Sequence, residues 1–322
     1  MGVGARCLMF QTNGWLNMYS MPSPFRFGVA LALSSCCAIV IAQPRQAAGE
    51  TSVSVGMTGL SQFNTRIVDS GSFNWQDASL NVNVTRQITS EFSAGASARY
   101  NYQNWSWSDL NAFGGRAPWT SINTPGLGLN FAYSPSPQWR FGFAPTVEWS
   151  GETGTGTGGT ATYGAVMSAA HTFSKDLTLG VGAGVFRQID QTKVFPYLLV
   201  NWNITDKLRL SNPLPAGPAG GAGLELSYAF NDRWTLGGGG AYRSYRFRLN
   251  ENSPVANGIG QNSFVPVFAR LSYSIDRTSR VDLYAAATTA GRLSATDNSG
   301  TTLLSTNYQT GFALALSFSK RF

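Results

Sequence analysis

The last sixteen residues of the chain, 307–322, alternate between bulky and small or polar side chains. Successive side chains of a β-strand point to opposite faces, so this segment has one large apolar face and one small or polar face. Globular strands usually run about 5–6 residues, whereas a tilted strand that crosses a bilayer needs roughly 9–11. Length and alternation together therefore favour a membrane-spanning β-strand.

The composition of the chain is consistent with many such strands. Of 322 residues only 12% are charged, 13% are aromatic and 36 are glycine. Beyond the N-terminal region no run of eighteen apolar residues occurs, which argues against helical membrane spans. Low charge with many glycines and aromatics suits a barrel in which each strand has a single apolar face.

The N-terminal residues 1–42 have the pattern of a secretory signal peptide. Arg26 supplies the positive charge, and the apolar stretch 27–42 ends in small residues suited to cleavage. Cleavage as late as residue 48 also fits, and Met21 is a candidate for the true start. The alternative is a membrane-anchoring helix. We expect Sec-type export and removal of this segment, which leaves 50–322 as a barrel domain.

The positions of the cysteines and the net charge limit the chemistry expected of the chain beyond the leader. The three cysteines, Cys7, Cys36 and Cys37, all lie in the leader, so no disulfide or thiolate site is predicted beyond it. The net charge of +7 is scattered along the sequence. Nucleic-acid binding usually needs a clustered basic face, so no nucleic-acid partner is expected.

Two kinds of connector alternate along the chain. Six are short polar turns flanked by bulky residues, at 88–92, 133–139, 173–177, 204–208, 230–234 and 275–281. Seven are mostly longer and rich in Gly, Asn, Ser, Thr and Pro, at 63–74, 105–121, 150–160, 189–193, 212–220, 249–261 and 291–306. These thirteen connections imply about fourteen strands, with both chain ends on the short-turn side.

The pattern predicts an all-β fold, a transmembrane antiparallel up-and-down β-barrel. The stretch 206–211 is short, and losing its hairpin would leave twelve strands. Two positions break the alternation. Arg86 falls on an apolar face, where its place beside a turn limits the cost to about 0–1 kcal/mol. The pattern also slips near 241–243, which predicts a β-bulge.

The chain resembles bacterial outer-membrane β-barrel proteins of the porin-like kind, most closely uncharacterised single-chain barrels known only as a domain-of-unknown-function group. The C-terminal strand carries the resemblance, because such proteins typically end in Phe after alternating apolar residues. Phe322, Phe318, Leu316 and Leu314 match this assembly signal, whereas Lys320 departs from it. The resemblance implies a bacterial outer-membrane location, contact with membrane lipid and lipopolysaccharide, and the barrel assembly machinery as a partner.

Small side chains dominate the predicted lumen face, and charged residues stand among them. The candidates are Arg99, Arg140, Glu148, Glu225, Arg270, Arg280 and Asp282. They could set the selectivity of a water-filled pore, or pair across the lumen and stabilise the wall. The stretch 105–121 is the best candidate for a loop folded into the lumen, although we favour a surface loop packed on the outer rim.

Three arginines and the single histidine are further candidates for function. Arg243, Arg246 and Arg248 alternate with aromatics, which favours solvated arginines in an interface girdle over lipopolysaccharide binding or a basic pore mouth. The single histidine, His171, lies near a short turn and is interpreted as an interfacial residue. No cofactor or metal site is predicted.

Three functions remain open from the sequence. We expect a porin-like channel for passive diffusion of small solutes. The alternatives are a structural or adhesive surface barrel with a closed lumen and, less favoured, a lipid-active barrel enzyme. We therefore do not expect the protein to be an enzyme.

Overall fold

The structure, a computed structural model, describes residues 47–68, 70–110, 115–213, 216–219 and 222–322. The predicted signal peptide lies outside these residues, so its export and cleavage stay predictions. No helix in the described ranges is long and apolar enough to span a membrane.

Seventeen strand segments form one sheet in the described part of the chain. Their bounds are β1 Thr51–Ile67, β2 Ser70–Gln87, β3 Phe92–Ser108, β4 Ser121–Tyr133, β5 Trp139–Trp149, β6 Gly151–Glu152, β7 Ala161–Ser174, β8 Leu177–Gln188, β9 Gln191–Asn203, β10 Leu208–Ser211, β11 Gly223–Ala229, β12 Trp234–Ala241, β13 Arg243–Arg248, β14 Ile259–Ser274, β15 Ser279–Thr296, β16 Thr302–Tyr308 and β17 Gly311–Arg321.

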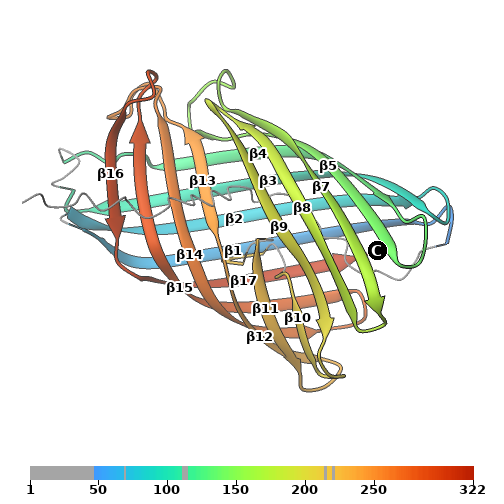
Figure 1. Cartoon of the computed structure of the whole chain (residues 1–322). Coiled ribbons are helices and arrows are strands. Elements are labelled where there is room, and N and C mark those ends of the chain that lie inside the picture. Colours follow the sequence, from blue (N-terminus) through green and yellow to red (C-terminus); the bar gives the residue numbers. More distant parts are fainter. Residues whose placement is uncertain (1–46, 69, 111–114, 214–215, 220–221) are drawn as a thin grey trace, which may run out of the picture.

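The sheet closes on itself, because β1 pairs antiparallel with β2 on one side and with β16 and β17 on the other. Three strands are interrupted: β5 continues as β6, β12 as β13, and β16 as β17. Counted as continuous, the segments in the described residues make a closed antiparallel barrel of fourteen strands (Figure 1). The weak hairpin of β10 and β11 is present, so the alternative of twelve strands is wrong.

The two rims of the barrel differ as predicted. One rim, the short-turn rim, carries the turns 88–91, 134–138, 175–176, 204–207, 230–233 and 275–278, and both Thr51 and Phe322 lie at it. The other, the long-loop rim, carries the remaining connections. Three of these are shorter than predicted: the strands continue through most of 63–74, 189–193 and 291–306.

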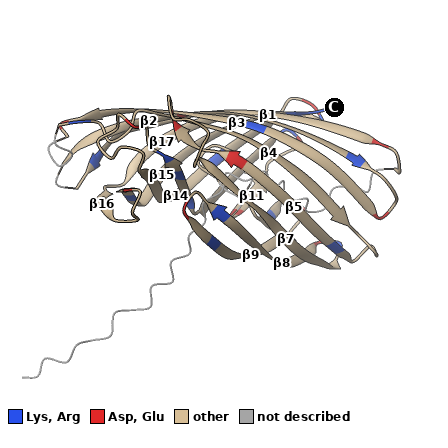
Figure 2. Cartoon of the chain, turned by 90° about the horizontal axis from the view of Figure 1, so that it is seen from above, with Lys and Arg blue, Asp and Glu red and all other residues tan. Residues whose placement is uncertain are grey.

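The outer surface is apolar and the inner surface small or polar over most of the wall. In β17 the bulky residues are exposed, as at Leu316 (58%), while Ala313 and Ala315 are buried. Trp139 stacks on Phe141, and Trp234 packs on Tyr273, near the short-turn rim. Such aromatics form the girdle expected at a membrane interface. Figure 2 shows that charged positions along the strands are few.

The structure tests the two predicted irregularities of the alternation, at Arg86 and around Tyr242. Arg86 is exposed near the end of β2 beside the turn 88–91, as expected for an interfacial arginine. The predicted bulge at 241–243 is wrong. Gly240 pairs with Val267 and Arg243 pairs with Phe264, so the register is continuous across the interruption. The alternation slips because residues on both faces of β13 are buried or half-buried, not because a residue is inserted.

Inside the barrel, the half nearest the long-loop rim is filled with rings. We call this group the aromatic cluster; it comprises Phe73, Trp75, Trp105, Trp107, Trp119, Tyr245, Phe247, Phe264 and Tyr308. Trp75 is 1% exposed and its ring stacks on Trp105, 5.4 Å between centroids. These side chains come from strands on several sides of the barrel, so they close the mouth rather than line it.

Candidate functional site

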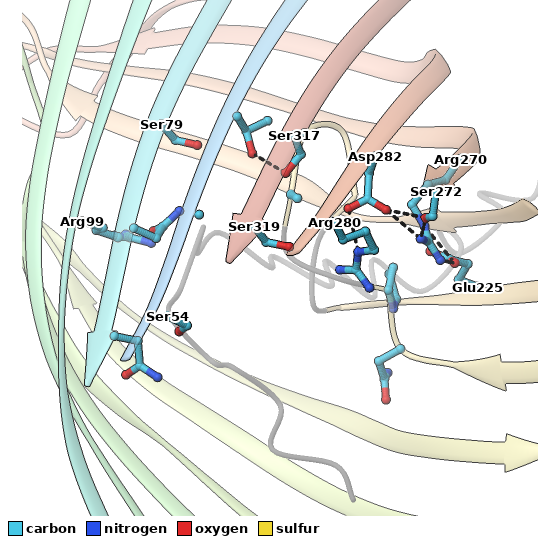
Figure 3. Close-up of a pocket in the computed structure, with 18 of the residues that line it drawn as sticks. Ser54, Ser79, Arg99, Glu225, Arg270, Ser272, Arg280, Asp282, Ser317 and Ser319 are labelled. Carbon is cyan, nitrogen blue, oxygen red and sulfur yellow. Dashed lines mark hydrogen bonds and ion pairs between the residues drawn. The ribbon is translucent and has the colours of Figure 1, made fainter. Parts of the chain in front are cut away.

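The other half of the lumen holds a polar cavity of about 830 Å³. It reaches the short-turn rim, where Thr205, Asp206 and Lys207 border it. Serine and asparagine side chains line much of its wall, including Ser54, Ser79, Ser317 and Ser319 in Figure 3. A cavity with this lining is hydrated, and polar solutes can exchange hydrogen bonds with its wall.

Four of the predicted lumen residues form one ionic network on the cavity wall (Figure 3). Arg270 of β14 forms an ion pair with Glu225 of β11 and donates from Nη1 to Asp282 Oδ1 of β15 at 3.0 Å. Arg280 donates from Nε to the other oxygen of Asp282, also at 3.0 Å. Because every carboxylate in this network faces a guanidinium, its charges are paired, and the group links β11, β14 and β15 along the wall.

Arg99 and Glu148 form a second pair across the wall. Arg99 lies on β3 and Glu148 on β5, and the two side chains are in direct ionic contact with β4 between them. Gly126 of β4 lies beneath the pair, since a Cβ there would meet Arg99 and Glu148. The charges of both predicted lumen residues are therefore balanced by each other.

Arg140 is placed differently from the other candidates. It is half-buried on β5 near the short-turn rim and does not border the cavity. It alternates with the exposed Trp139 and Phe141, as a lumen-facing residue would, but it lies outside the cavity lining, so its role in a pore stays a prediction.

Two cations that the sequence did not single out face the cavity. Arg209 of β10 is exposed to it and donates from Nε to Asn201 Oδ1 at 2.7 Å. Lys207 stands beside it in the turn 204–207. In the described residues neither forms a carboxylate ion pair. Neither was predicted, because the surrounding hairpin is too short to show an alternation of apolar and polar residues.

The loop that enters the lumen is mainly the connection between β10 and β11. Ala219 is fully buried against the cluster, and a Cβ on Gly217 would meet Ala315 of β17 and the ring of Tyr284. Arg243 donates to the carbonyl of Ala219 at 3.3 Å. The run of Pro, Gly and Ala at 213–222 was the available signal, since small residues allow a chain to pass close to a wall.

The stretch 105–121 also contributes to the closed mouth. Its first residues belong to β3, and Trp119 is fully buried between Trp105, Trp107 and Phe247. Trp107 donates from Nε1 to the carbonyl of Trp119 at 2.6 Å. The inward interpretation of this stretch is thus right for Trp119, and packing on the outer rim is wrong for it.

Small residues on the inner face do not always leave space. Gly182 and Gly184 of β8 lie under the rings of Tyr197 and Phe195 from β9, where any Cβ would overlap the ring. Phe195 in turn stacks on Phe186 at 5.8 Å. These glycines admit aromatic side chains close to the backbone, so this part of the wall is packed rather than open.

Three long loops are joined by one buried carboxylate. Glu152 is 7% exposed and accepts from the backbone N–H groups of Thr120 and Asn250, each at 3.0 Å, and from the hydroxyl of Ser253. Arg248 adds bonds to the carbonyls of Gly159 and Asn257. The loop residues 115–120, 153–160 and 249–258 are therefore held together over the mouth.

The three alternating arginines do not form the predicted solvated girdle. Arg243 bonds within the lumen, Arg246 pairs with Asp190, and Arg248 ties loops together. His171 does lie at the interface, with its ring 4.7 Å from Trp139 and 4.6 Å from Phe173 between centroids. Within the described ranges no cluster of metal-binding side chains occurs.

Residues 161–320, from β7 to β17, match a family described as "Domain of unknown function (DUF6268)". No curated protein matches the chain. Solved structures similar to it include an outer membrane channel from Pseudomonas putida F1, with 9% identity over 87% of this chain and 97% of that one at a TM-score of 0.46.

Two further structures are similar at comparable levels. The KdgM porin has 8% identity over 84% of this chain and 99% of its own, with a TM-score of 0.38. The TodX monoaromatic hydrocarbon channel has 9% identity over 86% and 91%, with a TM-score of 0.40. The closed antiparallel barrel, its apolar outer surface and its aromatic girdle identify this chain as a β-barrel protein of the bacterial outer-membrane type.

Proposed function

We propose that this barrel is a channel of the bacterial outer membrane for small polar solutes, with a preference for anions. The polar cavity at the short-turn rim is the observation that carries the proposal. A lumen of this size and lining admits hydrated ions and small metabolites, whereas a purely structural barrel gains nothing from an unfilled polar chamber.

The charge balance of the cavity supports an anion preference. Seven cations border it, Arg99, Lys207, Arg209, Arg243, Arg246, Arg270 and Arg280, against five carboxylates, Asp77, Glu148, Asp206, Glu225 and Asp282. Three of the carboxylates are held in ion pairs, and Asp77 accepts from Asn101 at 2.6 Å. A lining with excess positive charge lowers the energy of an anion relative to a cation.

Membrane assembly is the second part of the proposal. The signal peptide at 1–42 would direct Sec-type export, and the C-terminal strand with Phe322, Phe318 and Leu316 would be read by the barrel assembly machinery. The accessible ring of Phe322, 67% exposed, supports this role. The long-loop rim would then face outward, toward lipopolysaccharide, and the cavity would open to the periplasm.

Conductance of the purified, refolded protein in planar bilayers tests the channel. We expect a reversal potential in a KCl gradient that indicates anion preference, and a shift toward cations in Lys207→Glu/Arg209→Glu. Arg233→Glu, in the turn 230–233 and away from the cavity, is the control and should leave selectivity unchanged. A folded barrel that carries no current, with or without Trp119→Ala at the mouth, would rule the channel out.

A surface barrel that acts through its loops is the second candidate. The closed mouth favours it, since the aromatic cluster and the bonds of Glu152 fix the long-loop rim. It predicts no conductance, and loss of adhesion to a partner or matrix when residues 109–120 are replaced by a short Gly-Ser turn.

A further inference from the structure

The barrel wall is discontinuous between β9 and β13. β9 pairs with β8 along nearly its whole length but with β10 only at Asn201–Asn203. β13 pairs with β14 on one side, and on the other makes a single parallel bridge from Arg248 to Gly151 of β6. Within the described residues no strand covers the edges of residues 191–199 and 243–247 that face away from their partners.

This break is a built feature of the sheet. Asn212 ends it toward the short-turn rim by bonding to the backbone of Leu198, Val200 and Gly223. Pro196, which has no N–H to donate, lies on the uncovered edge of β9, where proline is tolerated. Figure 1 shows β9 and β13 separated along this stretch. The break reaches the long-loop rim at the turn between β8 and β9, so an opening at that end faces water and not the hydrocarbon core of the bilayer.

The polar cavity extends to the same place. Gln188 of β8, Ser244 and Arg246 of β13 and Thr162 of β7 all border it. Ser244 and Gln188 are 6% and 4% exposed, so neighbouring side chains cover most of both at this end of the cavity. The long-loop mouth, by contrast, is filled by the aromatic cluster. A solute in the cavity therefore meets polar side chains toward the break and rings toward the mouth.

One ion pair spans the break. Arg246 donates from Nη2 to Asp190 Oδ1 at 2.7 Å and to Oδ2 at 2.8 Å, and from Nε to Oδ1 at 3.2 Å. Asp190 lies in the turn between β8 and β9, and Gln261 of β14 holds Arg246 from the other side at 2.8 Å. This ion pair connects β13 to the turn between β8 and β9, although β13 is not paired with either of these two strands.

We propose that solutes cross the wall between β9 and β13 and not the long-loop mouth, and that the Arg246–Asp190 pair holds this side exit closed. The inference rests on the proposed channel function and names its route. Small oxyanions, such as carboxylates, fit the exit, because a carboxylate can replace Asp190 on the guanidinium fork.

Thiol blocking in planar bilayers tests the route. With Ser244→Cys, a negatively charged, membrane-impermeant methanethiosulfonate should remove most of the current. With Leu304→Cys, which packs against the aromatic cluster, and with Ser305→Cys, exposed at the same rim, the reagent should leave the current unchanged. Block through Leu304→Cys but not through Ser244→Cys would overturn the side exit while leaving the channel itself intact.

Charge exchange tests the ion pair. Asp190→Asn and Arg246→Gln should each raise the open probability about twofold to fivefold, the range that a partly exposed ion pair supports. Asp190→Arg/Arg246→Asp should return it toward the wild-type value. Arg292→Gln, at the same rim, is the control. Unchanged gating in both single variants would refute the closing role, and absence of current in every folded variant would refute channel and exit together.

Discussion

The two halves of the lumen are built on the same strands from different side chains. The inner face of β2 carries Phe73 and Trp75 toward the long-loop rim, then Asp77 and Ser79. β14 likewise changes from Phe268, 4% exposed, to Arg270 within one inward step. The same side of each strand faces inward along its whole length, so the two halves differ only in the chemistry of the inward side chains. The barrel is closed or hydrated according to what its inner face carries at each level.

The largest effect is expected in the apolar half, from Trp75→Ala. Its ring contacts Trp105, Tyr245 and Phe264, and its removal leaves a cavity, which costs about 3–5 kcal/mol in the free energy of unfolding. Urea unfolding in detergent measures the loss. Trp139→Ala, 44% exposed in the girdle, should cost much less. Equal losses for both would mean that the aromatic cluster is not a packed core.

In the polar half the corresponding change is Arg270→Met. It leaves Glu225 and Asp282, 2% and 1% exposed, without their shared guanidinium. We expect a loss of about 3 kcal/mol, the low end for a broken buried pair because the network borders a hydrated cavity. Arg280→Met, with a side chain 35% exposed, should lose less.

A second substitution tests whether Arg270 acts through its charge. Arg270→Met/Glu225→Gln should recover part of the stability, since Glu225 loses its guanidinium and is then neutralised, while Asp282 keeps its ion pair with Arg280. The unfolding free energies of the three variants form the measurement. If the double variant is less stable than Arg270→Met alone, the guanidinium acts by packing and not by pairing.

At the long-loop rim, Glu152→Gln should lower the free energy of opening of the loops by about 1 kcal/mol. The reason is that charge-assisted hydrogen bonds from Thr120 and Asn250 become neutral ones. Hydrogen exchange in residues 115–120 and 249–258 should speed up while β17 is unaffected. Glu251→Gln, exposed in the same loop, is the matched control. Protection unchanged in Glu152→Gln would show that other contacts hold the loops.

The outer surface of the barrel is easier to predict from the sequence than its interior. Alternation tells which side of a strand meets lipid, and it placed Leu316 and Arg86 correctly because that depends on neighbours in the sequence. Whether an inward side chain meets water or another ring depends on strands far apart in the chain. Trp105, which lies on β3, was therefore assigned to a loop, and Trp119 was expected on the outer rim.

The features of the candidate site that the sequence did not predict also depend on residues far apart in the chain. The uncovered edges beside Pro196 exist because β10 is only four residues long, and strand length at a weak hairpin is decided by its partners. The pairing of Arg99 with Glu148 and of Arg246 with Asp190 joins residues about fifty positions apart or more. Charged lumen residues were predictable, whereas their partners were not.

The smallest effect concerns the short-turn rim and depends on pH. Asp276 accepts from the backbone N–H and hydroxyl of Thr278 and the N–H of Ser279. These bonds, the one from the Thr278 N–H first, lower the pKa of Asp276 to about 2. Its unfolded pKa is about 3.9, so its contribution is complete above pH ~4 and is lost as the pH falls toward 2.

Another turn provides the matched comparison for Asp276. Asn231 holds the turn 230–233 by accepting from the N–H groups of Arg233 and Trp234, both at 2.9 Å, without a titrating group. Asp276→Asn should therefore keep its turn while flattening the loss of stability between pH 4 and 2, and Asn231→Asp should steepen it. Acid unfolding followed by tryptophan fluorescence measures both slopes. Identical slopes in the two variants and the wild type would mean that the turn carboxylate has no part in acid stability, which would then reside in the buried carboxylates of the polar half.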